Sequence, residues 1–264
     1  MVCLLRLCLQ VAPLAGGIVA ALLFRLTNDD SFRDEGDHAS RWMQTLSKCL
    51  MEFIGTFYLV LTISLTPLAG SNFGPIAIGL TLMAMVFAGG HVSGALYNPA
   101  VTLGIFLHRK DLLRLDGFLY FVVVQCAAAT AAAAAGHGLG HQLVYPFPMA
   151  PYSVGQSFAA EAVFTMALVT VVLNVATTKG NDGNYFFGLA IGFTVLAGAA
   201  TVSPISGAAF NPAVATGLSI VAAIHSDANV QYLWVYWVRV LPRLRAHVGW
   251  VGTVMLTSIV LLVV

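Results

Sequence analysis

One twelve-residue stretch occurs twice in this chain, 113 positions apart, and it limits the folds that the chain can adopt. The first copy starts at Ser93 and reads SGALYNPAVTLG, and the second starts at Ser206 and reads SGAAFNPAVATG. Each copy predicts a loop that becomes a helix at an asparagine, Asn98 or Asn211. Asn is a favoured helix N-cap, and the proline that follows suits the first helical position because no N–H is needed there.

The apolar run behind each copy, 100–107 or 213–223, is too short to cross a bilayer, which takes about 20 helical residues. The chain as a whole nevertheless has a membrane composition, because 59% of its 264 residues are hydrophobic and 9% are charged, where a soluble domain has roughly 25% charged residues. Loop backbone is tolerated at membrane depth where it lines a cavity. The sequence therefore predicts two re-entrant half-helices in an integral, multi-pass membrane protein.

Longer apolar runs surround the two motifs in the same order in each half. A run with an early glutamate (Glu52 or Glu161) is followed by a second run, the half-helix and a third run; the six runs are 49–65, 74–87, 115–136, 158–176, 186–200 and 232 onward. Because each unit has three spans, the second unit crosses the membrane in the opposite orientation. The expected fold is therefore all-α, an inverted repeat with a six-helix core and a functional site near the bilayer midplane. The expected divisions are an apolar segment with a polar linker (1–47), two repeats (48–145 and 152–238) and an aberrant last span (239–264).

Basic residues fall on one side of this arrangement. Eight of the twelve Lys and Arg residues lie in 25–48, 108–114 and 177–184, whereas loops 66–73 and 137–156 hold no Lys or Arg. The positive-inside rule therefore predicts that the 108–114 and 177–184 loops are cytoplasmic. The membrane itself is expected to be the plasma membrane or an organelle membrane. No basic cluster indicates nucleic acid, and no metal or cofactor is expected, because the four cysteines lack ligand spacing and His137 and His141 have no third ligand nearby in the sequence.

On these residues the chain resembles the aquaporin family, the major intrinsic proteins. The two Asn-Pro-Ala motifs are accompanied by Glu-Phe-Ile-Gly-Thr-Phe from Glu52, Gly-His-Val-Ser-Gly-Ala from Gly90 and Tyr-Trp-Val from Tyr236. The resemblance covers about 48–238 and implies six tilted helices with two half-helices, a homotetramer in the lipid bilayer, and passive conduction of water or small neutral solutes.

The resemblance also implies roles for particular residues. Asn98 and Asn211 are expected to meet at the pore centre and donate N–H groups to passing molecules, and Glu52 and Glu161 to brace the loops. For the asparagines the alternative is a plain structural cap, and for Glu52 it is a residue at the interface. Both half-helix N-termini would point at one spot, where their positive dipole ends repel cations. The expected pore motif is Asn98, Pro99, Ala100, Asn211, Pro212 and Ala213, and the expected carbonyl acceptors are those of Gly94, Ala95, Leu96, Gly207, Ala208 and Ala209.

Members of the family have a narrow ring of four residues, the selectivity constriction, at the outer end of the pore. By their sequence distance from the two asparagines, the corresponding residues here are Ile78, Ala199, Ala208 and Val214, called the outer ring below. Most members have an Arg where this chain has Val214. Without that Arg, and with a small Ala199, the ring is expected to be wide and apolar, so that urea, ammonia, hydrogen peroxide or glycerol could pass with water. Mercury-sensitive relatives have a Cys where this chain has Ala208, so mercurial block should be weak unless Cys49 or Cys126 is accessible. His91 is interpreted either as a pH-sensing group or as a loop histidine bonded to backbone.

The last span departs from the family pattern, because five residues that a membrane span disfavours (Arg239, Pro242, Arg243, Arg245 and His247) follow Val238. In contrast, 12–27 resembles the second half of an aquaporin sixth helix. Two hypotheses follow: the chain is a tandem-array fragment or is frameshifted after Val238, or residues 2–26 fill the position of the sixth helix. The function predicted is a passive channel and not an enzyme, with a non-conducting structural protein of the same fold or a secondary transporter as alternatives.

Overall fold

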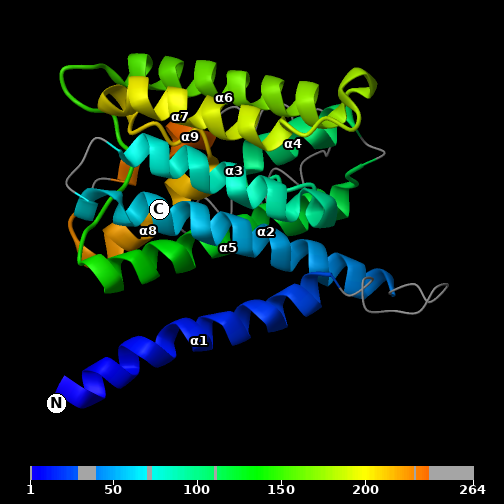
Figure 1. The fold of residues 1–264 in the computed structure, drawn as a ribbon. Coiled ribbons are helices and arrows are strands. Elements are labelled where there is room, and N and C mark those ends of the chain that lie inside the picture. Colours follow the sequence, from blue (N-terminus) through cyan, green and yellow to red (C-terminus); the bar gives the residue numbers. More distant parts are fainter. Residues whose placement is uncertain (1, 29–39, 70–72, 110–111, 229, 238–264) are drawn as a thin grey trace.

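The structure is a computed structural model that describes residues 2–28, 40–69, 73–109, 112–228 and 230–237. Within these ranges the regular elements are helices (Figure 1). Five of them are long and apolar enough to cross a membrane: α2 (Arg41–Leu65), α3 (Gly74–Ser93), α5 (Leu115–Gly140), α6 (Val154–Thr177) and α7 (Phe187–Ser206). The predicted all-α membrane fold is confirmed.

The two shorter helices behind the repeated motifs are α4 (Pro99–His108) and α8 (Pro212–His225). They have 10 and 14 residues, too few to cross a bilayer. The sixth predicted span begins as α9 (Trp234–Trp237), and its continuation from 238 lies outside the described residues. Short 3₁₀ turns (Thr66–Ala69, Lys179–Asn181 and Val230–Tyr232) complete the helical elements.

The two halves of the chain meet where α3 crosses α7. Gly79 and Gly192, which occupy equivalent positions 113 residues apart, lie backbone to backbone at this crossing. A Cβ atom on Gly79 would be 2.7 Å from the Gly192 carbonyl oxygen, and a Cβ on Gly192 would be 2.5 Å from the Gly79 carbonyl oxygen. Small residues allow membrane helices to approach this closely. The reciprocity of the contact is what a two-fold relation between the halves requires.

Some helix boundaries differ from the predictions. Helix α2 begins at Arg41, within the segment 1–47 that was expected to end in a polar linker, because the Ser40 hydroxyl accepts a hydrogen bond from the Met43 N–H (3.4 Å) and caps it. Helices α3 and α7 continue to Ser93 and Ser206, one to two turns past the apolar runs that predicted them. These extra turns bring the spans directly to the two loops.

Helix α1 (Val2–Thr27) lies outside the bundle and approaches it at its C-terminal end (Figure 1). There the Ser47 hydroxyl donates to the Leu26 carbonyl oxygen (2.7 Å). Leu14, Ile18 and Leu22 are 60–69% exposed, so α1 does not fill the position of a sixth helix and that hypothesis is wrong. The tandem-array or frameshift hypothesis stays a prediction, because 239–264 lie outside the described residues.

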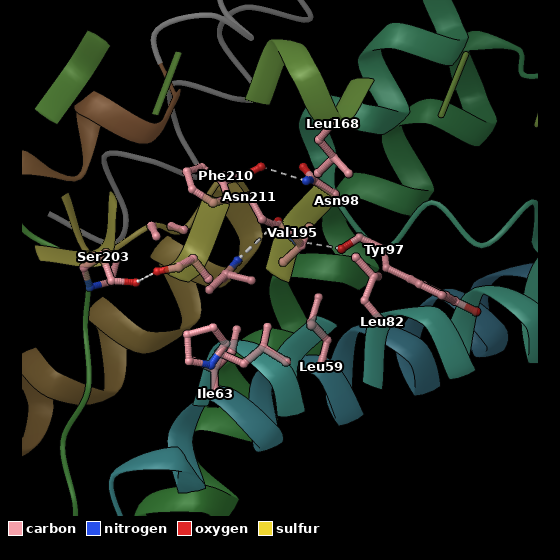
Figure 2. Close-up of a pocket in the computed structure, with 18 of the residues that line it drawn as sticks. Leu59, Ile63, Leu82, Tyr97, Asn98, Leu168, Val195, Ser203, Phe210 and Asn211 are labelled. Atoms are coloured by element: carbon pink, nitrogen blue, oxygen red, sulfur yellow. Dashed lines mark hydrogen bonds between the residues drawn. The ribbon is translucent and has the colours of Figure 1, made fainter. Parts of the chain in front are cut away.

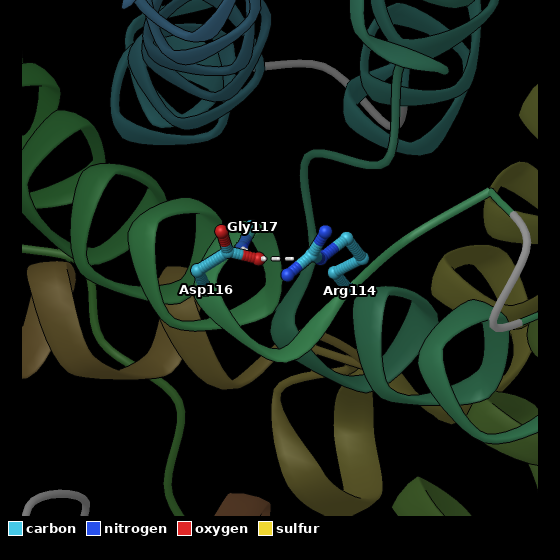
Figure 3. Close-up of polar contacts among 3 residues, drawn as sticks. All are labelled: Arg114, Asp116 and Gly117. Atoms are coloured by element: carbon cyan, nitrogen blue, oxygen red, sulfur yellow. Dashed lines mark hydrogen bonds and ion pairs between the residues drawn. The ribbon is translucent and has the colours of Figure 1, made fainter.

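The N-terminus of α2, the α4–α5 connection and the α6–α7 connection share one end of the bundle, called here the basic end (Figure 1). At the start of α5, Arg114 Nε lies 3.7 Å from Asp116 Oδ1, which also accepts from the Gly117 N–H at 3.0 Å (Figure 3). The two side chains are 80% and 63% exposed, so the ion pair adds little stability. Asp116 also lies in the first helical turn, where the helix dipole favours a carboxylate.

Candidate functional site: two loops at the centre of the bundle

Each half-helix is preceded by a loop with the same unusual backbone conformation. The glycines that end α3 and α7, Gly94 and Gly207, have φ of 91° and 83°. Non-glycine residues also adopt positive φ at equivalent places, and these are Ala95 (53°), Ala208 (50°), Tyr97 (50°) and Phe210 (47°). Such residues cost about 1–3 kcal/mol each and persist only where their surroundings hold them, which is typical of functional sites.

The first loop is held by Glu52, which projects from α2 and is fully buried. One carboxylate oxygen accepts from the Ser93 hydroxyl (2.7 Å) and the Leu96 N–H (2.9 Å). The other accepts from the Tyr97 N–H (2.7 Å) and the Gln125 side-chain amide (2.9 Å). Four donors match the four acceptor positions of a carboxylate. The interfacial alternative for Glu52 is excluded by this burial.

The second loop is held in the same way by Glu161 of α6, which is 4% exposed. One carboxylate oxygen accepts from the Ser206 hydroxyl (2.7 Å) and the Ala209 N–H (3.0 Å). The other accepts from the Phe210 N–H (2.7 Å). In both loops, therefore, two backbone N–H groups are bonded to a buried glutamate.

The two asparagines cap their own half-helices. Asn98 Oδ1 accepts from the Ala100 N–H at 2.8 Å, and Asn211 Oδ1 accepts from the Ala213 N–H at 3.0 Å. Pro99 and Pro212 occupy the first helical position that the sequence predicted for them. Because each Oδ1 faces backbone donors, each Nδ2 must point away from its own helix.

The amide nitrogens then bind across to the opposite loop (Figure 2). Asn98 Nδ2 donates to the Phe210 carbonyl oxygen at 2.8 Å, and Asn211 Nδ2 donates to the Tyr97 carbonyl oxygen at 2.9 Å. The two motifs therefore lie together at the centre of the bundle, each bonded to the residue that precedes the other's asparagine.

A cavity of about 260 Å³ runs past these amides towards the end of the bundle opposite the basic end. Its wall is mostly aliphatic and includes Leu59, Ile63, Leu82, Leu168 and Val195 (Figure 2). All four residues of the expected outer ring line this cavity, as do five of the six residues whose carbonyls were expected to face a pore: Ile78, Ala199, Ala208, Val214, Ala95, Leu96, Gly207 and Ala209.

A second cavity, of about 550 Å³, opens at the basic end. Gly94, the remaining residue of the expected set, lines it together with the charged residues Arg109, Lys179 and Asp182. The two cavities have four lining residues in common, Val86, Ala95, Val172 and Ile191. They therefore adjoin at a predominantly aliphatic neck on the basic side of the two asparagines.

Sequence reasoning missed several residues that hold the site. The Tyr97 hydroxyl donates to the Met85 carbonyl oxygen (2.9 Å), and its ring fills space left by two glycines. The Tyr236 hydroxyl donates to the Ser206 carbonyl oxygen (2.7 Å), and Trp237 Nε1 donates to Thr216 Oγ1 (2.9 Å). A buried polar residue in a membrane span, such as Gln125, was a signal that could have been used.

Three side predictions can be compared with the structure. His91 lies in the last turn of α3, and its Nε2 is 2.9 Å from Asn28 Oδ1, so its partner is a side chain and not the backbone. Cys126 is buried and Cys49 is partly buried. Among the described residues no group of three or more His, Cys, Asp or Glu side chains could hold a metal ion.

Comparison with known proteins decides the family. The model of the family described as "Major intrinsic protein" matches residues 69–242. The chain belongs to the major intrinsic protein family. It is thus a passive, multi-pass membrane channel for water and small solutes, and not an enzyme.

Among its relatives, Aquaporin NIP1-4 of Oryza sativa subsp. japonica is 34% identical over 72% of this chain and 70% of the relative. Aquaporin AqpM of Methanothermobacter thermautotrophicus is 31% identical over 74% of this chain and 90% of the relative. The solved aquaglyceroporin from Plasmodium falciparum has the same fold, with a TM-score of 0.63 and 20% identity over 76% of this chain and 95% of that one.

Proposed function

We propose that water and small neutral solutes pass through the 260 Å³ cavity beside Asn98 and Asn211. The observation that carries this proposal is that both amides and all four outer-ring residues line a single cavity. Each side-chain amide has two N–H hydrogens, and one is used in the bond to the opposite loop. The second hydrogen is then available to a molecule in the cavity.

The chemistry of this centre favours uncharged permeants. The N-termini of α4 and α8 both begin at the asparagines, so their partial positive charges act on the same point. A cation would meet this field after losing most of its hydration in an aliphatic passage, whereas a neutral molecule is little affected. The loop carbonyls of residues 94–96 and 207–209 are proposed as acceptors along the way.

The outer ring is proposed to be permissive for solutes such as urea, ammonia, hydrogen peroxide or glycerol. Val214 is 2% exposed, lies in the first turn of α8 and lines the cavity together with Ala199. Neither side chain carries a hydrogen-bond donor or a charge. An apolar ring therefore selects by size more than by hydrogen bonding.

Val214→Arg tests this proposal. In proteoliposomes, stopped-flow shrinkage should show glycerol and urea permeability reduced about tenfold or more, because the guanidinium narrows the cavity and adds a fixed charge, while water permeability falls less. Val214→Leu is the control, since it adds volume without charge. Background solute permeability in the unmodified chain, with rapid water flux, would contradict the permissive ring. Absence of all flux from a folded protein would contradict the channel itself.

We also propose that the chain forms a homotetramer. In α3 and in α6, only 22% of an 18-residue apolar stretch is buried within the chain, compared with 50% of the corresponding stretch in α5. These helices therefore have wide apolar faces available to lipid or to neighbouring copies. The molecular mass of the detergent-solubilised protein, measured by light scattering with the detergent contribution subtracted, should correspond to four chains.

A further inference from the structure

The outer ring has a counterpart in the other half of the repeat. Equivalent residues of α3 and α7, of the two loops and of the two half-helices are 113 positions apart. Applied to the outer ring, this shift gives four residues, called here the inner ring: Ile191, Val86, Ala95 and Val101, in place of Ile78, Ala199, Ala208 and Val214. In an inverted repeat, equivalent residues lie on opposite sides of the bilayer midplane. The inner ring is therefore expected on the basic side of the two asparagines.

The structure places the inner ring at the neck between the two cavities. Val86, Ala95 and Ile191 line both the cavity of about 260 Å³ and the cavity of about 550 Å³, and Val101 lines the first of them. The fourth residue of the neck, Val172 of α6, also lines both cavities. A molecule that travels from one cavity to the other must therefore pass these side chains.

The inner ring is the narrower of the two rings. Both rings contain an isoleucine, an alanine and a valine at equivalent positions, and they differ only at the fourth position, where Val86 corresponds to Ala199. Every side chain of the inner ring is 6% exposed or less, whereas Ile78 and Ala208 of the outer ring are partly exposed. The larger side chain of Val86 thus goes together with a tighter enclosure.

The side chains of the neck have little freedom to move aside. Val86, Val172 and Ile191 are β-branched and lie in the helices α3, α6 and α7, where such side chains have one strongly preferred rotamer. Gly192 directly follows Ile191 in the sequence, and its backbone contact with Gly79 fixes the separation of α3 and α7. The width of the neck is therefore set by the side chains themselves.

This inference rests on the proposed passage of solutes through the cavity beside the asparagines. We infer that the inner ring, and not the outer ring, sets the size of the largest solute that the channel conducts, and that Val86 is the residue that determines this limit. The side chains of the inner ring are aliphatic and offer a permeant no hydrogen bond. Such a constriction selects by size and by the cost of removing water from the permeant.

The test compares glycerol with erythritol, a longer polyol with the same kind of hydroxyl groups, by stopped-flow measurements on proteoliposomes. Val86→Ala should raise the ratio of erythritol to glycerol permeability several-fold, with little change in water permeability. Val172→Ala widens the neck from another helix and should raise the ratio in the same direction. The double variant Val86→Ala with Ala199→Val exchanges the two side chains between the rings, and its ratio should return close to that of the wild type.

Val163→Ala is the matched control, because Val163 is 53% exposed and lines neither cavity, and it should leave the ratio unchanged. Size-exclusion elution and far-ultraviolet circular dichroism check that each variant is folded, and Val172→Ala keeps the inference testable if Val86→Ala fails that check. A wild-type ratio in Val86→Ala and Val172→Ala, measured in folded chains that conduct glycerol, would overturn the inference, as would a ratio in the double variant as high as in Val86→Ala. Absence of all flux from the folded wild-type chain is a separate outcome, which would contradict the proposed passage and this inference with it.

Discussion

The loops before α4 and α8 share one backbone conformation and are each held by a buried glutamate, but the further side chains that hold them differ. Four donors surround Glu52, including the side-chain amide of Gln125 from α5. Three donors surround Glu161. In the second half the neighbouring helix α9 instead binds the loop directly, through the Tyr236 hydroxyl on the Ser206 carbonyl. The backbone path and three hydrogen bonds to the glutamate are therefore common to the two halves, and the remaining contacts have diverged.

The space around the two carboxylates differs accordingly. A cavity of about 20 Å³ lies beside Glu161 and is lined in part by Thr165, Asn211 and Tyr236. That volume is enough for one water molecule, with polar groups to bind it. The corresponding position beside Glu52 is taken by Gln125. The first loop is thus held by protein groups alone, whereas the second has room for a water molecule as a further donor.

The largest difference in stability between equivalent variants of the two halves is expected at the equivalent glycines of the half-helices, Gly104 and Gly217. A Cβ on Gly217 would lie 2.4 Å from the Ala129 carbonyl carbon and 2.6 Å from the Thr130 nitrogen, both backbone atoms of α5. Gly217→Ala must therefore push α8 away from α5, at a cost of about 3 kcal/mol or more. A Cβ on Gly104 would lie 2.6 Å from one methyl of Val169, with its next contact at 3.9 Å. Gly104→Ala should cost about 1 kcal/mol because that side chain can rotate.

Apparent unfolding temperatures in detergent measure both glycine variants. The double variant Gly104→Ala with Val169→Ala serves as the control, and it should return to nearly wild-type stability. Equal destabilisation by Gly217→Ala and Gly104→Ala would show that the two half-helices are packed equally tightly.

The second largest difference is expected between the stabilities of the variants that lack one of the two glutamates. Glu52→Ala leaves four donors without their acceptor and Glu161→Ala leaves three, one of which can bind water in the adjoining cavity. A lost hydrogen bond to a charged group costs about 1.5–3 kcal/mol, so Glu52→Ala should be less stable than Glu161→Ala by about that amount. Chemical or thermal unfolding of the two variants in one detergent gives the comparison.

Gln125→Met is the matched control for this pair of glutamate variants. It removes the donor that the second half lacks. When Gln125→Met is combined with each glutamate variant, the difference in unfolding free energy between Glu52→Ala and Glu161→Ala should become smaller. A gap that stays the same would mean that Gln125 contributes nothing to the difference.

The smallest effect is expected at two hydroxyl groups. Tyr97→Phe removes the bond to the Met85 carbonyl but leaves the ring in place, which should cost about 1 kcal/mol. Tyr236→Phe removes the bond to the Ser206 carbonyl and should cost a similar amount. Because Ser206 begins the second loop, Tyr236→Phe alone should also speed amide hydrogen exchange in 206–210. Faster exchange in that loop in both variants would show that the halves are not held independently.

The half-helices were predictable because their signals are local. Asn followed by Pro sets a helix start within two residues, and the short apolar run behind it sets the length, so α4 and α8 agree with the sequence to within two residues. The early glutamates were noticed because a charge in a membrane span is costly and therefore conspicuous.

The contacts that complete the site were not predictable, because they join residues far apart in the chain. Gln125 is 73 residues from Glu52, and the bonds from Asn98 and Asn211 to the opposite loops cover 112 and 114 residues. Their acceptors are backbone carbonyls, which every residue has, so no residue type indicates them.

The exchanged amide bonds have a consequence for biosynthesis. Asn98 leaves the ribosome 112 residues before Phe210, whose carbonyl is its partner. Until the later segment is made, the Asn98 amide and the three positive-φ residues before it (Gly94, Ala95 and Tyr97) have no counterpart, so the central crossing forms only after translation of the second half. Two separately expressed fragments, divided in the connection between α5 and α6, would therefore have to find each other in the membrane before either loop reaches its final state.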